Sequence, residues 1–346
     1  MKRWGSRLAL VALLAFVACG DLREARPGAD AGPDASAAPT DGGTSGGLDS
    51  RDASAHRDGG RVTCPAPCEP EQISTMGNLG PVVVDSFNVY FGSADGGVWK
   101  VTKSVDHKLT KLGDGKATRL VLAADRVWWG DGDHLVACAI GGCGGIPEGR
   151  LLDQTGIDEL MTDGAKIVWH AHVGASDVIR ACPAKTCGSA TTEDVASILA
   201  PRAGMGLGAN KVFWVDLQSK LYFCPLDSTP CLAPTEVAAG SNDASVFGDT
   251  VFWVHGQDIE SCNAAGCVGP KKIGTSPSPH LLVADDSDLY WRELVDEKVL
   301  RCPVGGCAGD PEEIATGVDG IYYGGLALDA EYVYWTSRAG LFRRRK

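Results

Sequence analysis

The sequence is short of basic residues and contains no common catalytic motif. Lys and Arg number 32 against 44 Asp and Glu, so the formal net charge is −12. Because phosphate binding needs a basic surface, we expect no nucleic-acid partner. The chain has no Gly-rich phosphate loop between a strand and a helix, no Ser in a nucleophile elbow and no zincin pattern. We therefore predict no catalytic residue.

Charged side chains are also sparse, at 22% of the chain, whereas glycine is abundant, with 45 residues. This balance favours many tight turns between short strands over long surface helices. Composition alone therefore predicts an all-β protein.

The one apolar run near the N-terminus, residues 8–18, is too short to span a bilayer as a permanent helix. It follows three basic residues, which is typical of an export signal. The run ends in Phe16-Val-Ala-Cys19, which resembles the lipobox of bacterial lipoproteins, with Phe16 where that motif usually has Leu. We expect residues 1–18 to be a lipoprotein signal peptide and Cys19 to carry the lipid. A cleaved signal peptide with a chance Cys is the alternative.

Residues 20–60 are dominated by Ala, Asp, Gly, Ser and Pro and show no apolar periodicity. Such a segment cannot bury a core, so we expect 19–60 to be a disordered tether. Residues 61–346 then form the folded part. The expected location is outside the cytoplasm, anchored to a bacterial membrane through Cys19 and facing the periplasm or the cell surface.

A pattern of four short apolar runs, separated by turn residues, recurs along residues 61–346 with a period of 38 to 45 residues. Four strands per repeat at this period are typical of propeller blades. An aromatic pattern ends the second run of each of seven copies: Val89–Phe91, Val127–Trp129, Ile167–Trp169, Val212–Trp214, Val251–Trp253, Leu289–Trp291 and Val333–Trp335. The sequence predicts a seven-bladed β-propeller with four-stranded blades.

The repeats also predict how the ring closes. A fourth run at 73–75 precedes the first complete repeat, and the last repeat ends in its third run at 341–343. We therefore expect one blade to be shared between the two ends of the chain. The recurring Trp side chains are predicted to pack between blades rather than to hold a quinone cofactor.

Twelve cysteines follow Cys19 and fall into close pairs between the third and fourth runs. In an exported chain such pairs predict disulfides rather than zinc ligands, because separate blades keep the pairs apart. The first full repeat has no pair. The predicted disulfide residues are Cys64 and Cys68, Cys138 and Cys143, Cys182 and Cys187, Cys224 and Cys231, Cys262 and Cys267, and Cys302 and Cys307.

The segment Leu328-Asp-Ala-Glu-Tyr-Val-Tyr-Trp-Thr-Ser337 resembles the YWTD propeller repeat of the low-density-lipoprotein receptor class. Two departures are that only the last repeat has Thr after Trp, and that seven repeats occur where that family has six. The pattern is also similar to that of bacterial extracytoplasmic propeller lipoproteins of unassigned role. The resemblance implies a propeller that binds proteins or other ligands without catalysis.

Polar side chains just after the repeat aromatics should project from the face that carries the loops between blades. We expect binding residues among Asp131, His170, His172, Asp216, His255, Arg292 and Glu293. His170 and His172 fall on one side of a continuing strand, an arrangement that suits a metal ion. The other interpretation is that all seven are solvated loop residues. No cofactor is predicted, although a divalent cation could be held here.

The sequence thus predicts an envelope-anchored, monomeric propeller that acts as a non-catalytic binding module. Its partner would be an envelope or extracellular protein or a polar ligand. The alternative is a metal-dependent propeller hydrolase, lactonase or lyase that uses the polar residues named above. A propeller with a purely structural role is a third interpretation.

Overall fold

The computed structural model of the chain describes residues 57–58, 61–62, 69–132, 134–144, 148–151, 156–174, 176–198, 201–319 and 324–346. Within these ranges the helical element is a single 3-10 turn, η1 (Ser189–Thr191), and no helix is long and apolar enough to cross a membrane. A short ribbon pairs β1 (Arg57–Asp58) with β2 (Arg61–Val62). The predicted signal peptide, Cys19, the Cys64 and Cys68 pair and the predicted tether apart from residues 57–58 lie outside the described residues.

Seven four-stranded antiparallel sheets account for the other strands. Blade 1 consists of β4 (Leu79–Val84), β5 (Asn88–Ser93), β6 (Val98–Thr102) and β7 (Leu109–Gly113). Blade 2 consists of β8 (Ala117–Ala123), β9 (Arg126–Asp131), β10 (His134–Ala139) and β11 (Glu148–Leu151). Blade 3 consists of β12 (Leu160–Thr162), β13 (Lys166–Val173), β14 (Ser176–Pro183) and β15 (Glu193–Ile198).

The next three blades repeat this order. Blade 4 consists of β16 (Pro201–Gly208), β17 (Lys211–Asp216), β18 (Lys220–Pro225) and β19 (Thr235–Ala239). Blade 5 consists of β20 (Ser241–Phe247), β21 (Thr250–His255), β22 (Asp258–Asn263) and β23 (Lys271–Thr275). Blade 6 consists of β24 (Pro279–Ala284), β25 (Asp288–Glu293), β26 (Lys298–Pro303) and β27 (Glu312–Ala315).

Blade 7 is shared between the two ends of the chain. It combines β28 (Leu326–Leu328), β29 (Tyr332–Thr336) and β30 (Leu341–Arg345) with the early strand β3 (Glu71–Ser74). β3 pairs antiparallel with β30, with Glu71 opposite Arg343 and Ser74 opposite Leu341. The predicted seven-bladed propeller and its closure by a shared blade are therefore confirmed.

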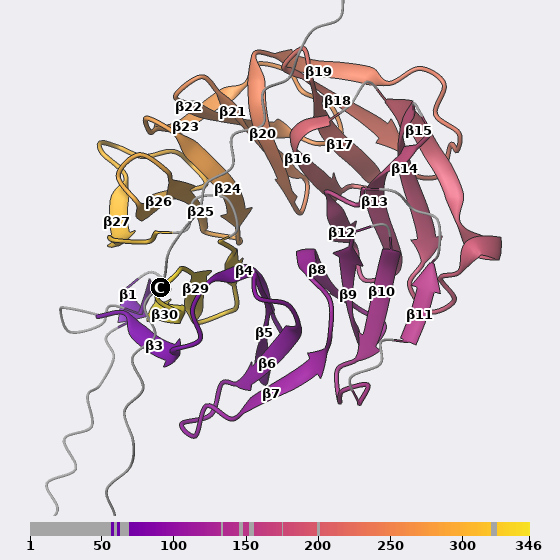
Figure 1. Cartoon of the computed structure of the whole chain (residues 1–346). Coiled ribbons are helices and arrows are strands. Elements are labelled where there is room, and N and C mark those ends of the chain that lie inside the picture. Colours follow the sequence, from indigo (N-terminus) through magenta and orange to yellow (C-terminus); the bar gives the residue numbers. More distant parts are fainter. Residues whose placement is uncertain are drawn as a thin grey trace, which may run out of the picture. The chain divides into compact units, whose positions relative to one another are not determined.

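The blades follow one another around a common centre (Figure 1), with the first strand of each blade innermost. Consecutive inner strands contact each other around the ring, and β28 contacts β4 where the ring closes. Because the strands alternate in direction, one face carries the loops between strands two and three and the connections between blades. We call it the loop face. The opposite face, which carries the turns between strands one and two, is the turn face.

The aromatic residues near the end of the second strand of each blade explain why the blades pack. Adjacent side chains in a strand point to opposite sides of the sheet, so Tyr290 contacts blade 7 and Trp291 contacts blade 5. Every interface between blades holds such a buried cluster. The predicted packing role of the Trp side chains is confirmed.

The turn face is built by Asp side chains that cap the turns between strands one and two. The Asp85 carboxylate accepts hydrogen bonds from the backbone N–H groups of Phe87 and Asn88, both at 2.7 Å. Asp163, Asp285 and Asp329 make the same pair of bonds in blades 3, 6 and 7. A side-chain carboxylate that bonds the backbone two and three residues on stabilises such a turn.

Five disulfides close the loops between strands three and four of blades 2 to 6, which confirms those five predicted pairs. In blade 1 side-chain hydrogen bonds hold the equivalent loop instead. Thr102 Oγ1 and Ser104 Oγ both donate to Asp106 Oδ1, and the Lys108 backbone N–H donates to Thr102 Oγ1 at 2.8 Å. The missing Cys pair of the first repeat is thus replaced by a polar network.

Candidate functional site

The predicted site residues all lie where a second strand reaches the loop face. Three of them, each in a different blade, pack against a glycine of the connection that enters the same blade. These glycines have a positive φ, and a β-carbon on any of them would fall within 2.8 Å of the side chain. The pairs are Asp131 with Gly115, His172 with Gly156, and His255 with Gly240. The blade architecture therefore places these side chains at equivalent points around the ring.

Asp131 and His255 each make contacts close to their own hairpins. Asp131 accepts a hydrogen bond from the Lys116 backbone N–H at 2.9 Å. His255 Nδ1 lies 3.5 Å from Glu260, and half of the imidazole is exposed. The two residues hold the edges of their blades and leave part of their surface on the loop face.

Asp216 is buried and shapes its own turn. Its Oδ1 accepts hydrogen bonds from the backbone N–H groups of Gln218 at 2.8 Å and Lys220 at 2.9 Å. The residue also lines a hollow of about 230 Å³ beside Trp214 and Tyr222. Its carboxylate is thus committed to the β17–β18 hairpin.

Arg292 is 1% exposed and links blade 6 to blade 7. Its guanidinium donates to the carbonyl oxygens of Val318 at 2.8 Å, Asp319 at 3.2 Å and Thr336 at 3.4 Å. Burial lowers the pKa of Arg292 to about 10, because desolvation disfavours the charged form. This cation ties the connection into blade 7 to the end of β29 beneath the loop face.

Glu293 is equally buried, with 2% of its surface exposed. Its carboxylate accepts hydrogen bonds from the Ser276 hydroxyl and from the backbone N–H groups of Ser278 and Val295, the last two at 2.9 Å. Glu293 therefore organises the loop that enters blade 6 and the loop that follows β25.

His170 and His172 are the predicted pair that the structure brings into contact. Their rings meet edge to face, with centroids 4.7 Å apart. His170 Nε2 lies 2.9 Å from Asp177 Oδ1, and His172 Nδ1 contacts the same oxygen. On the other side, Asp158 Oδ2 lies 3.9 Å from His170 Nδ1 and 3.4 Å from His172 Nε2. Two strands and one connection of blade 3 supply this cluster.

The two imidazoles differ in their surroundings. His170 is 1% exposed, whereas 43% of the His172 side chain is accessible. Burial lowers the pKa of His170 below its ordinary value, and the hydrogen bond to Asp177 offsets only part of that effect. A lowered pKa favours the neutral form of His170, which keeps a lone pair on one ring nitrogen.

A second group of polar residues, which the sequence did not point to, lies at the start of the inner strands. Inner strands in five blades carry a β-bulge just after they leave the loop face. A bulge re-aims the side chains around it and is common next to binding sites. Arg119 of blade 2 and the buried Asp243 of blade 5 occupy the same bulge position, so the direction of both side chains depends on an irregularity that periodicity does not reveal.

Ion pairs join these residues to neighbouring blades. Arg119 Nε and Nη2 donate to the two carboxylate oxygens of Glu159 at 3.0 and 2.8 Å. Asp243 Oδ2 accepts from the Leu281 backbone N–H at 2.9 Å and lies 3.2 Å from His280 Nδ1. Glu159 raises the pKa of Arg119, and Asp243 and Asp158 add to that effect. We call Arg119, Glu159, Asp243 and His280 the channel mouth.

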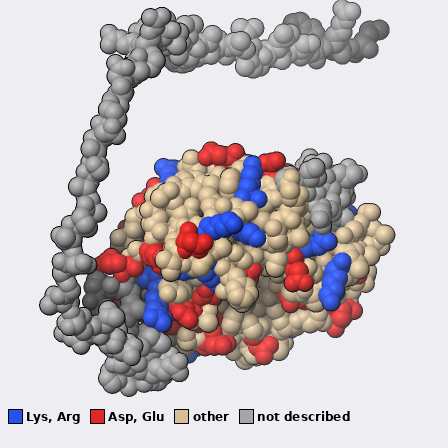
Figure 2. Space-filling view, turned by 90° about the horizontal axis from the view of Figure 1, so that it is seen from below, with Lys and Arg blue, Asp and Glu red and all other residues tan. Residues whose placement is uncertain are grey.

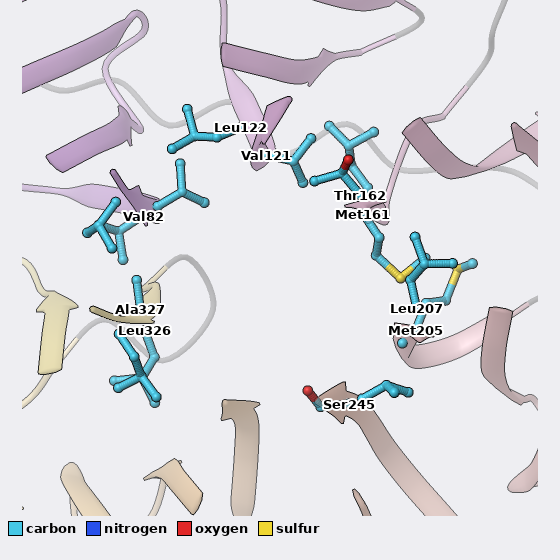
Figure 3. A pocket seen from close by; sticks show the side chains of 16 residues that line it. Val82, Val121, Leu122, Met161, Thr162, Met205, Leu207, Ser245, Leu326 and Ala327 are labelled. Atoms are coloured by element: carbon cyan, nitrogen blue, oxygen red, sulfur yellow. The ribbon is translucent and has the colours of Figure 1, made fainter. Parts of the chain in front are cut away.

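The inner strands also line an axial channel of about 430 Å³. Figure 3 shows Val82, Val121, Met161, Met205 and Leu326 among the side chains around its open centre. Inner strands of six blades contribute to this lining, and nearly all the side chains are apolar. Charged residues at the loop-face end of the inner strands therefore accompany a channel lined by apolar side chains, and a few polar groups beside apolar walls are the usual composition of a ligand pocket.

A larger hollow of about 640 Å³ lies on the turn face at the seam between blades 7 and 1. Lys103 Nζ lies 2.5 Å from Asp329 Oδ2, and the Tyr334 hydroxyl donates to the same carboxylate oxygen at 2.7 Å. The polar groups that line the seam thus bind one another across the point of ring closure. On the surface in view in Figure 2, acidic and basic side chains are interspersed without a basic stripe.

No family model matches this chain, and no curated protein matches its sequence. Solved structures share its fold at low identity. Virginiamycin B lyase from Staphylococcus aureus is 16% identical, with a TM-score of 0.60 over 80% of this chain and 97% of the lyase chain. Kuenenia stuttgartiensis hydrazine synthase is 11% identical, with a TM-score of 0.61 over 79% of this chain and 97% of that one.

The WD40 β-propeller domain of Doa1 is also similar, with 12% identity and a TM-score of 0.57 over 80% of this chain and 96% of the domain. These likenesses place the chain among seven-bladed β-propellers. Because these similar structures include a lyase, a synthase and a WD40 domain, the fold alone does not distinguish between binding and catalysis.

Proposed function

We propose that this chain is an exported, membrane-anchored propeller that binds a partner protein or a polar ligand at its channel mouth. The observation that carries the proposal is the set of bulged inner strands that bring Arg119 and Asp243 to the loop-face end of an apolar channel. Charged groups around an apolar hollow give both orientation and buried area to a bound molecule. Binding there requires no chemical step.

Export and anchoring come from the sequence. The signal-like N-terminus and Cys19 support a lipid anchor, and the five disulfides agree with folding in an oxidising compartment. We therefore propose a YWTD-like binding propeller that the predicted tether anchors to a membrane. The alternative of a hydrolase, lactonase or lyase gains no separate support from the fold.

The test is capture of partners from envelope membranes with the chain and two matched double variants. The first double variant, Arg119→Gln with His280→Gln, removes the guanidinium of Arg119 and the imidazole of His280 from the channel mouth. Lys220→Gln with Lys272→Gln changes two cations that pair with carboxylates on outer parts of blades 4 and 5. We expect the mouth variant to lose a molecule that the wild type and the outer variant both retain. Equal capture by all three proteins, or no reproducible capture, would overturn the proposal.

A further inference from the structure

We propose that Asp158, His170 and His172 form a binding site for a divalent transition-metal ion of the zinc class. One ligand atom of each residue lies within 4.8 Å of the other two. Two imidazole nitrogens and a carboxylate oxygen are a donor set that Zn²⁺ accepts in proteins. The site belongs to blade 3 alone, so it does not depend on the proposed function of the channel mouth.

The distances between these atoms need little adjustment. With metal–ligand bonds of about 2.0–2.1 Å, neighbouring ligand atoms of a tetrahedral site lie roughly 3.4 Å apart. His172 Nε2 is 3.4 Å from Asp158 Oδ2, and His170 Nδ1 is 3.9 Å from the same oxygen. Asp158 is exposed and lies in a connection rather than a strand, so its side chain can close the remaining gap.

Asp177 prepares both imidazoles for this role. It lies against His170 Nε2 and His172 Nδ1, the two nitrogens that face away from Asp158. A carboxylate that accepts N–H hydrogen bonds at those positions fixes the proton there and leaves the opposite nitrogen as a lone pair. Asp177 thereby directs two lone pairs toward one point, which is the arrangement that metal-binding histidines share.

His170 supplies an independent observation that points to a ligand at this cluster. The whole residue is 1% exposed. Its Nδ1 is buried and has no hydrogen-bond partner among the described residues. A buried acceptor without a partner is costly to keep. A metal ion between Nδ1, His172 Nε2 and Asp158 would satisfy that lone pair directly.

Three protein ligands leave a fourth position of a tetrahedral ion open to water or to a bound molecule. This position faces the loop face, because His172 and Asp158 are the exposed members of the set, with 43% and 64% of their side chains accessible. The ion would therefore be reachable from the same side of the propeller as the channel mouth.

The experiment uses the full chain without a polyhistidine tag, stripped of metal and titrated with ZnCl₂ in a calorimeter. We expect saturable binding of one Zn²⁺ per chain. Asp177→Asn should weaken binding by roughly 10–100-fold, as is usual for the carboxylate behind a metal-bound histidine. His172→Ala removes a ligand and should weaken it more. His172 is half exposed, so this variant keeps the fold, which the temperature of unfolding checks.

His255→Ala is the matched control, because His255 is a half-exposed histidine at the equivalent end of a second strand and pairs with Glu260. It should bind Zn²⁺ as tightly as the wild type. Zn²⁺ should also raise the unfolding temperature of the wild type and His255→Ala, but not of His172→Ala. Absence of saturable binding, or binding that His172→Ala leaves intact, would overturn the metal site. Neither result depends on whether the channel mouth binds a partner.

Discussion

The guanidinium of Arg292 occupies the space that a side chain on Gly324 would need. A β-carbon built on Gly324 would fall 1.5 Å from Arg292 Nη1. Position 324 therefore requires glycine, because the connection into blade 7 passes directly over the buried guanidinium there. Arg292 therefore links blade 6 to blade 7. Its position in the sequence, directly after the aromatic of the repeat, did not indicate this role.

Gly324→Ala should destabilise the propeller by about 2 kcal/mol or more, because the added methyl group overlaps a well-packed buried group. The midpoint of denaturant unfolding measures the effect. Gly309→Ala is the control, since a β-carbon there meets nothing within 4 Å. Equal midpoints for the two variants would show that the connection does not pass over Arg292 as described.

Deletion of residues 61–75 should lower the unfolding free energy by about 3 kcal/mol or more, the order expected for losing one large buried core side chain. The deletion removes β3, the buried Ile73 and the Glu71 carboxylate, which lies 2.7 Å from Arg343 Nε. Thermal unfolding is the measurement. Deletion of residues 30–44, an equal length of the predicted tether, should leave the unfolding temperature unchanged, and the same temperature for both deletions would contradict closure by β3.

Stability should fall in acid through Asp329. Burial opposes ionisation of this carboxyl, but Lys103, Tyr334 and two backbone N–H groups outweigh it, so its pKa lies below the ordinary 3.8. The unfolded chain then takes up the proton first, and the contribution of Asp329 is full above about pH 4 and is lost as the pH falls below that value.

The unfolding free energy of the wild type and of Asp329→Asn, measured between pH 6 and pH 2, separates this contribution from other carboxyls. The variant is expected to be less stable at pH 6 and to lose less stability toward pH 2. Parallel pH profiles would show that Asp329 does not supply the acid dependence.

Cys19→Ala should move the protein from the membrane fraction to the soluble fraction, because a lipid chain at this residue would supply the anchor. Fractionation of cells that export the chain, followed by immunoblotting, measures the partition. Cys302→Ala is the control, since this residue belongs to a disulfide of blade 6 and not to the predicted lipobox. Membrane partition that Cys19→Ala leaves unchanged would contradict the predicted lipoprotein.

The repeats predicted the fold well because each blade is specified locally. The spacing of the aromatic runs gave seven blades, and the incomplete runs at 73–75 and 341–343 gave the shared blade. Blade packing follows from the alternation of side chains in residue pairs such as Tyr290 and Trp291, which needs no knowledge of distant contacts.

The site was less predictable, because its contacts join separate strands and loops. His170 and His172 stand out in sequence, but Asp177 comes from the next strand and Asp158 from the connection before the blade. The channel mouth depends on bulges, and a single extra residue in a strand changes where a side chain points without changing the apolar pattern. Thr118-Arg119 and Asn242-Asp243 therefore look like ordinary strand ends in the sequence.

The most direct test of the proposed function is photo-crosslinking from the two ends of one inner strand. A photoreactive phenylalanine analogue replaces Asn242, beside Asp243 at the channel mouth, or Phe247, which is exposed at the turn-face end of β20. The two positions are roughly 16 Å apart along the strand. We predict a specific crosslinked product from position 242 and none from position 247 in exporting cells. Products from 247 alone, or from neither position, would contradict binding at the channel mouth.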